Sequence, residues 1–145
     1  MADKPFSGKH AELTDRILAA FYKVHRVMGF GFHEKVYENA LAIELRQQGM
    51  EYEQQKEIPV FYDGKIVGVY VADIVVHGIV LLELKSVRQL IGQHEAQLLN
   101  YLKATPIEVG LLLNFGPVAE VKRRIFDNDV KGSLLWTSRN NESGE

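Results

Sequence analysis

The stretch that decides the fold reads Tyr70-Val-Ala-Asp73 and, after a turn at His77-Gly78, Leu82-Glu83-Leu84-Lys85. It places two acids and a lysine inside segments that are otherwise strongly apolar. An ionised carboxylate left unpaired in a protein interior costs several kcal/mol, so such groups are normally paired, bound to a metal ion or shifted in pKa. A metal site would account for all three charged residues at once.

Strand-forming residues continue on both sides of this stretch. Segments 52–62 and 65–76 flank Asp63-Gly64, a strong hairpin signal, and segment 80–86 follows the second turn. The pattern therefore predicts three antiparallel strands in a meander.

The length of the second turn decides what lies opposite Asp73. A two-residue loop would set it across from Leu82, whereas a three-residue loop that pairs Val76 with Val80 sets it across from Glu83. We predict the longer loop, with Gly78 at positive φ. Because side chains alternate along a strand, Glu83 and Lys85 share one face of the third strand.

Helical periodicity precedes the strands. The apolar spacing over 11–28 predicts an amphipathic helix that ends at Gly29, and a second helix is predicted over 33–48, stopping at Gly49. Glu34 falls on the same line of this helix as Tyr37, so its carboxylate is predicted to point inward. An alternative is that Glu34 only stabilises the first turn through the helix dipole.

The rest of the chain supplies a third helix and further strands. Segment 94–104 predicts a helix with Gln97 and Tyr101 one turn apart, 108–115 a strand buried on both faces, and 120–126 a short edge strand. We expect one domain over 1–137 and a polar, disordered tail over 138–145.

Composition excludes several classes of function. The net charge is −2 in 145 residues, so nucleic-acid contact would have to come from a metal site or a local patch such as Lys122-Arg123-Arg124. The absence of cysteine excludes thiol catalysis and a disulfide scaffold. The longest apolar runs are far below the roughly 20 residues that span a bilayer. These features predict a cytoplasmic protein without a membrane partner.

The converging acids indicate a particular chemistry. Two or three carboxylates at one spot, without cysteine or a histidine pair at zinc-ligand spacing, suit Mg²⁺ or Mn²⁺. A lysine beside such an ion can orient water and stabilise the charge that builds on a phosphate. Phosphodiester cleavage is the predicted reaction.

Asp73 followed by Glu83-Leu84-Lys85 on consecutive strands resembles the signature of the PD-(D/E)XK nuclease superfamily. Gly31-Phe-His-Glu34-Lys-Val-Tyr37 reads Gly-x-x-Glu-x-x-Tyr and resembles the bacterial GxxExxY family within it. Gln97-Leu-Leu-Asn-Tyr101 is similar to the Gln-x-x-x-Tyr motif of RecB-like exonucleases. The resemblance implies an α/β fold with a restriction-endonuclease-like core, which comprises helices, a three-stranded antiparallel meander, a crossover helix and a further buried strand in a mixed central sheet.

The resemblance also implies roles for individual residues. Asp73, Glu83 and the backbone carbonyl of Leu84 would bind the metal ion, Lys85 would handle the attacking water, and Glu34 would be a further acid at the same centre. Gln97 and Tyr101 would help to hold substrate. The chain departs from the family pattern at Ala72, where a proline is usual, and at Val71, where an arginine is common.

Three functions remain open at this point. The first is an Mg²⁺-dependent nuclease acting on DNA, with RNA as the other substrate class. The second is a nucleic-acid-binding or regulatory module that keeps the fold but is inactive without a partner. The third is a structural domain in which the acids form a buried ion-pair cluster with Lys85. Small nucleases of this fold often pair to reach two strands, so a homodimer is a further expectation.

Overall fold

The computed structural model describes residues 8–131 and contains one five-stranded sheet. Its strands follow the order β1-β2-β3-β4-β5 from one edge of the sheet to the other. Along the chain the elements are α1 (Ala11–Met28), α2 (Glu34–Gln47), β1 (Tyr52–Tyr62), β2 (Lys65–Val76), β3 (Val80–Lys85), α3 (Gly92–Lys103), β4 (Val109–Phe115), β5 (Ala119–Ile125) and a 3-10 turn, η1 (Asn128–Val130).

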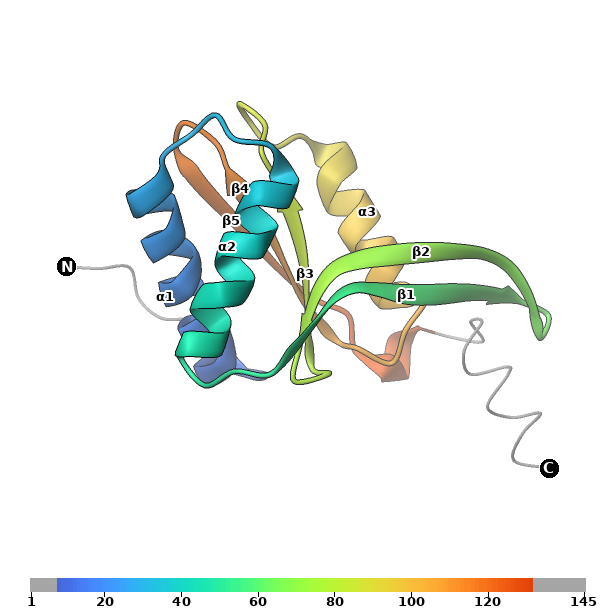
Figure 1. Cartoon of the computed structure of the whole chain (residues 1–145). Coiled ribbons are helices and arrows are strands. Elements are labelled where there is room, and N and C mark those ends of the chain that lie inside the picture. Colours follow the sequence, from blue (N-terminus) through green and yellow to red (C-terminus); the bar gives the residue numbers. More distant parts are fainter. Residues whose placement is uncertain (1–7, 132–145) are drawn as a thin grey trace.

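The sheet is mixed. Strands β1, β2 and β3 form an antiparallel meander, β3 and β4 run parallel, and β5 returns antiparallel to β4. A parallel pair needs a crossover connection, and α3 supplies it between β3 and β4 (Figure 1). The predicted α/β core with its meander, crossover helix and further buried strand is therefore confirmed.

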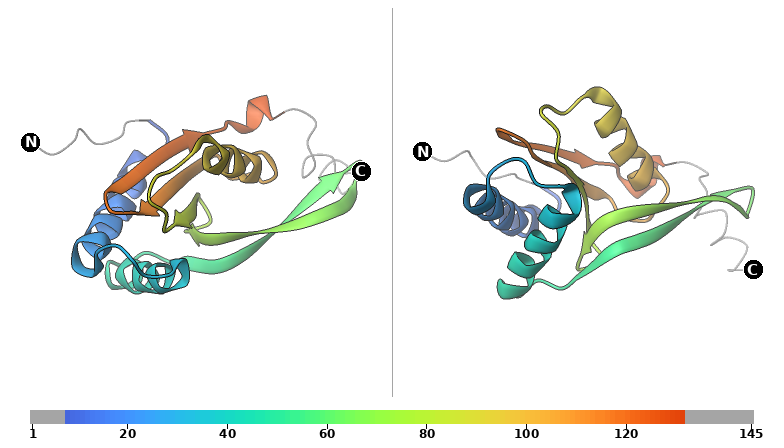
Figure 2. Two further views of the ribbon diagram at one scale, coloured as in Figure 1. Left: turned by 90° about the horizontal axis from the view of Figure 1, so that it is seen from above. Right: turned by 45° about the horizontal axis from the view of Figure 1, so that its top comes forward.

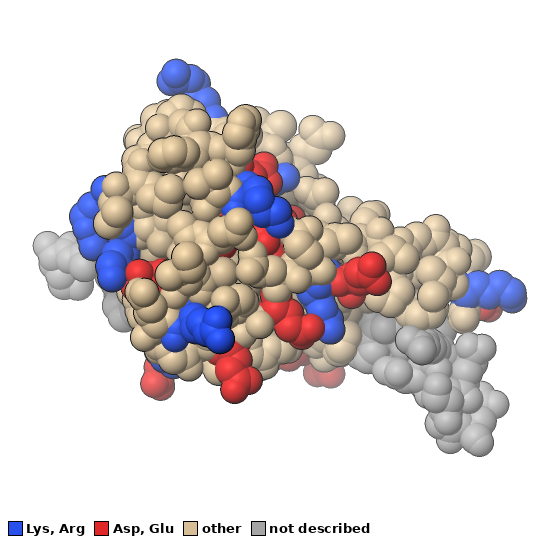
Figure 3. All heavy atoms as spheres, in the orientation of Figure 1, with Lys and Arg blue, Asp and Glu red and all other residues tan. Residues whose placement is uncertain are grey.

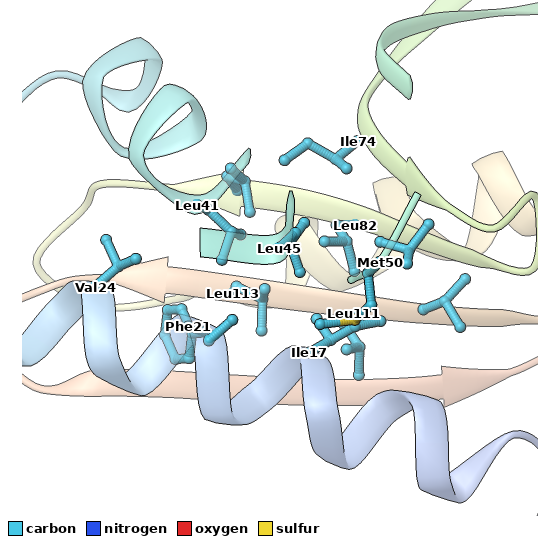
Figure 4. Close-up of a cluster of buried hydrophobic side chains, with 14 of the residues drawn as sticks. Ile17, Phe21, Val24, Leu41, Leu45, Met50, Ile74, Leu82, Leu111 and Leu113 are labelled. Carbon is cyan, nitrogen blue, oxygen red and sulfur yellow. The ribbon is translucent and has the colours of Figure 1, made fainter. Parts of the chain in front are cut away.

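Helices cover both faces of the sheet. Helices α1 and α2 pack side by side on one face, and α3 packs on the other (Figure 2). The larger core lies under α1 and α2, where the apolar stripes predicted from the sequence meet alternate residues of β2, β3 and β4 (Figure 4). Its labelled members are Ile17, Phe21, Val24, Leu41, Leu45, Met50, Ile74, Leu82, Leu111 and Leu113.

A smaller core lies under α3. Leu81, Leu98 and Leu102 are fully buried there. Gly110 of β4 lets the helix approach closely, because a Cβ at this position would lie 2.8 Å from Leu98 Cδ1. Helix α3 is thereby held against the strands that carry the charged residues.

The distal part of β1 and β2 leaves the body of the molecule as a two-stranded ribbon (Figures 1 and 2). Large apolar side chains on this ribbon are exposed to solvent, among them Tyr62, Ile66, Val67 and Val69. The proximal part of β2, by contrast, is buried from Ile74 to Val76. One long strand therefore belongs to two environments.

The predicted turn between β2 and β3 is confirmed. Val76 pairs with Val80, and Gly78 has φ of 67°. Helix α3 begins at Gly92, two residues before the predicted start, and the tail predicted from Ser138 lies outside the described residues. Across residues 8–131, every helix is too short or too polar to cross a membrane.

Candidate active site

Asp73 and Glu83 lie where β2 and β3 separate. The two strands pair through Val76–Val80, Val75–Leu81 and Ile74–Leu82, and beyond these pairs β2 turns away with β1 (Figure 1). Beyond the last strand pair, the two carboxylates accept hydrogen bonds from backbone amides of these strands. Asp73 Oδ2 accepts a hydrogen bond from the Leu84 amide at 2.8 Å, and Glu83 Oε1 accepts one from the Asp73 amide at 3.3 Å.

Both acids are shielded from water, and their pKa values rise as a result. Burial raises the pKa of Asp73 to about 6, although the hydrogen bond from the Leu84 amide opposes the rise. Burial raises the pKa of Glu83 to about 9, and repulsion from Asp73 adds to the rise. The positive charge of Lys85 lowers both values by less than burial raises them. If both were ionised, the pair would carry more negative charge than its surroundings balance, and the raised pKa values reflect this.

Lys85 is next along the face of β3 that carries Glu83. Its Nζ lies 3.5 Å from Gln97 Oε1 of α3, and Gln97 Nε2 donates to the Tyr101 hydroxyl at 3.2 Å. Burial and the charges of Glu83 and Asp73 raise the pKa of Tyr101 to about 12, so its phenol remains neutral beside the acids. Five of the predicted side chains are thus brought together: Asp73, Glu83, Lys85, Gln97 and Tyr101.

Glu34 departs from its prediction. The inward orientation is wrong, because Glu34 is exposed whereas Tyr37, on the same line of the helix, is fully buried. Glu34 is the first residue of α2, and the stripe passes the edge of the core there. Its charge still raises the pKa of both Asp73 and Glu83, so it stands at the rim of the same centre.

The structure also contains an acid that the sequence analysis missed. Glu38 of α2 is 4% exposed, and it accepts hydrogen bonds from Gln54 Nε2 at 2.7 Å and Gln55 Nε2 at 2.8 Å. Lys35 Nζ adds an ion pair at 3.2 Å. The charge of Glu38 contributes to the raised pKa of Asp73. Helical spacing could have indicated Glu38, which is one turn after Glu34, but its glutamine partners come from a kink in β1 at Gln55, where φ is 54°.

Polar contacts fix the two residues that follow Lys85. Asn114, fully buried on β4, accepts from the Val87 amide and donates to the Val87 carbonyl, both at 2.9 Å. Ser86 donates from its hydroxyl to the Phe32 carbonyl at 2.7 Å, which ties the loop before α2 to the end of β3. These hydrogen bonds fix the backbone next to Lys85 and so position the lysine beside the two acids. No sequence pattern predicted them.

Tyr37 of the Gly-x-x-Glu-x-x-Tyr segment has a structural part in this arrangement. Its hydroxyl donates to the Gly29 carbonyl and accepts from the Phe32 amide at 3.3 Å. Its ring stacks on Phe115 with centroids 4.4 Å apart. As expected for a buried tyrosine, the hydroxyl is used in hydrogen bonds that shape the loop before α2.

The donor set is suited to a hard divalent cation. Asp73 and Glu83 present carboxylate oxygens, the ligands that Mg²⁺ and Mn²⁺ prefer, in a place where negative charge is poorly balanced. The structure brings two of the three predicted acids together. Within residues 8–131 no group of three or more His, Asp or Glu side chains is close enough to hold a metal ion.

Basic residues do not gather at the site. On the face drawn in Figure 3 lysines and arginines are interspersed with acids. In the run Lys122-Arg123-Arg124, Arg124 pairs with Glu95 of α3 and Arg123 donates to the Lys9 carbonyl. This run is engaged within the fold, so it offers less free positive charge than its sequence indicates.

Comparison with known proteins agrees with this geometry. The model of the PD-(D/E)XK nuclease superfamily matches residues 11–125. A solved structure titled "Crystal structure of SSO0001" is similar in fold, with 17% identity and a TM-score of 0.52 over 94% of this chain and 68% of that chain. No curated protein matches. Because the family match spans most of the sequence and includes Asp73, Glu83 and Lys85, the chain belongs to the PD-(D/E)XK nuclease superfamily.

Proposed function

We propose that the protein is a nuclease that hydrolyses DNA phosphodiester bonds with Mg²⁺ or Mn²⁺. Superfamily membership suggests nuclease activity on a nucleic acid, and nucleases of this superfamily typically use divalent metal ions. The observation that carries the proposal furthest is the meeting of Asp73 and Glu83 at the point where β2 leaves β3, with Lys85 on the same face.

In this proposal Asp73, Glu83 and the Leu84 carbonyl hold the ion. Glu34 would act from the rim through the water that such ions retain. The bound ion supplies Lewis-acid polarisation of the phosphate and a lower pKa for the attacking water. The chain itself contributes Lys85, which orients that water and balances charge on the phosphate, while Gln97 keeps the lysine in place.

The narrower relationship to the GxxExxY family is also part of the proposal. Gly31, Glu34 and Tyr37 carry its motif. Its support here is that Tyr37 orders the loop of Gly31 and Phe32, and that this loop bonds to Ser86 beside the active lysine.

Cleavage of labelled DNA in Mg²⁺ or Mn²⁺ tests the proposal. Lys85→Ala should lower the rate by about a hundredfold to ten-thousandfold, the range for a lost acid–base or electrostatic group. Lys103→Ala, an exposed lysine in the last turn of α3, is the matched control and should leave the rate unchanged. Asp73→Asn and Glu83→Gln should lower the rate as Lys85→Ala does.

The outcome also separates the alternatives. A folded wild type that binds metal and DNA but does not cut either DNA or RNA would favour the partner-dependent module. A wild type that binds no divalent ion would favour the buried ion-pair cluster. Equal activity of wild type and Lys85→Ala would remove the proposed role of the lysine.

A further inference from the structure

A cavity of about 510 Å³ adjoins Lys85 on the α3 side of the sheet. Its lining comes from β2 and from one face of α3, and comprises Tyr70, Gln93, His94, Ala96, Gln97 and Asn100. Gln97 links the cavity to the centre, because the same side chain lies 3.5 Å from Lys85 Nζ. Whatever occupies this cavity would be next to a phosphate at Lys85.

The lining is polar but uncharged. Burial and the charge of Lys85 lower the pKa of His94, which keeps its imidazole neutral at physiological pH, and no lysine, arginine or acid is among these described lining residues. A phosphate would need cationic partners. Side-chain amides such as Gln93 and Asn100 both donate and accept hydrogen bonds, which matches the edge of a neutral nucleobase.

One wall of the cavity is aromatic. Tyr70 is 43% exposed, and its ring packs on Tyr101 with centroids 4.9 Å apart and a tilt of 55°. Tyr101 thus supports one side of Tyr70 and leaves ring surface open for stacking. Base stacking on an aromatic ring contributes about 1–3 kcal/mol per base. The cavity volume is also within the roughly 300–1,000 Å³ of small-molecule sites.

We propose that this cavity receives one unpaired nucleobase of the substrate, stacked on Tyr70 and bonded at its edge by Gln93 or Asn100. The inference rests on the proposed nuclease function and narrows its substrate class. A base inside a duplex is stacked on both faces and cannot enter a side cavity unless it is extruded. The preferred substrate therefore presents a single-stranded, frayed or extruded nucleotide next to the bond that is cut.

The first test combines an abasic scan with variants of Tyr70. Single abasic positions are moved along a labelled single strand, and cleavage by the wild type should drop about tenfold to a hundredfold at one position relative to the cut. Tyr70→Ala should lose the same factor on the intact strand and nothing further on that abasic strand. Tyr70→Phe should retain wild-type cleavage, and Gln93→Ala, a helix-compatible change, should weaken it less.

The matched control is Tyr62→Ala. Tyr62 is on the same hairpin and 70% exposed, so its loss should change neither intact nor abasic cleavage. No sensitive position in the scan, or equal losses for Tyr70→Ala on intact and abasic strands, would overturn the base cavity while leaving the nuclease function intact.

A second readout does not depend on cleavage. In the Lys85→Ala background a strand that contains 2-aminopurine at the sensitive position, or at each position in turn if nothing is cut, should lose fluorescence when it binds. Tyr70→Ala should abolish that quenching. A wild type that cuts nothing but quenches in a Tyr70-dependent way would refute the proposed function and support the cavity; quenching that persists in Tyr70→Ala would refute the cavity.

Discussion

The structure contains two shielded acidic centres, Glu38 of α2 and the pair Asp73 and Glu83 of β2 and β3, and their carboxylates have different hydrogen-bond partners. Glu38 receives three side-chain donors, from Lys35, Gln54 and Gln55. Asp73 and Glu83 receive one backbone amide each. A buried carboxylate whose bonds are satisfied supports the fold, whereas a pair without enough balancing charge destabilises it. The difference separates an acid kept for architecture from acids suited to a cation.

Metal binding at Asp73 and Glu83 should produce the largest change in folding stability. Mg²⁺ or Mn²⁺ at 100 to 1,000 times its Kd should stabilise the wild type by about 3–4 kcal/mol, because it binds the folded state alone. Asp73→Asn should remove most of this gain, as read from urea unfolding with and without metal. Asp63→Asn at the hairpin tip is the control, and a full gain in Asp73→Asn would contradict the assignment.

Removal of Glu38 should produce the next largest effect, in the opposite direction. Glu38→Ala should lower the free energy of unfolding by about 1–3 kcal/mol, because the amides of Gln54 and Gln55 lose their acceptor and the kink of β1 loses its anchor. Glu38→Gln keeps the volume and should cost less. Thermal or urea unfolding measures both, and an unchanged stability in Glu38→Ala would mean that the two centres do not differ as described.

Glu83 should make the folding stability of the metal-free protein depend on pH. Its pKa is about 9 when folded against an ordinary 4.5, so between these values the folded state holds the extra proton and stability falls as pH rises. The free energy of unfolding of Glu83→Gln should therefore rise relative to that of the wild type from pH 5 to pH 8. The difference should reach about 0.5–2 kcal/mol at pH 8. Urea unfolding in the presence of a chelator measures this difference in stability. A difference that shrinks as pH rises would contradict the raised pKa of Glu83.

The ion pair of Lys35 should matter least. Its side chain is 58% exposed, and exposed pairs contribute about 0.2–1 kcal/mol. Lys35→Ala should therefore cost less than Gln55→Ala, which removes a donor at the kink itself. Urea unfolding of the two variants side by side ranks the partners of Glu38, and a larger loss for Lys35→Ala would reverse that ranking.

Much of the centre could be predicted because strand period and loop length are local properties. The pairing of Val76 with Val80 follows from the turn at His77-Gly78, and it brings Asp73 beside Glu83 just past the last strand pair. The face shared by Glu83 and Lys85 follows from alternation, and helical spacing puts Gln97 beside Tyr101.

The residues that escaped prediction depend on where elements end and how they dock. Glu34 lies on the same side of α2 as Tyr37, but the core covers Tyr37 and does not extend to Glu34. Helical periodicity predicts which side of a helix faces the core, but not where along the helix the core ends. Glu38 is buried against Gln54 and Gln55, where β1 kinks at a non-glycine residue with positive φ. The two hydrogen bonds between Asn114 and Val87 join residues 27 positions apart in the sequence. They are a tertiary contact that no local sequence pattern indicates.

The ribbon of β1 and β2 has a consequence for how the molecule opens. From Ile74 to Val76 the backbone lies under two cores, whereas around Val67 and Val69 it has solvent on both faces. Amide hydrogens should therefore exchange quickly at the distal end of β2 and slowly at its root, within one continuous strand. Asp73 marks the boundary between the two regimes, so fraying of the ribbon ends where the carboxylates begin.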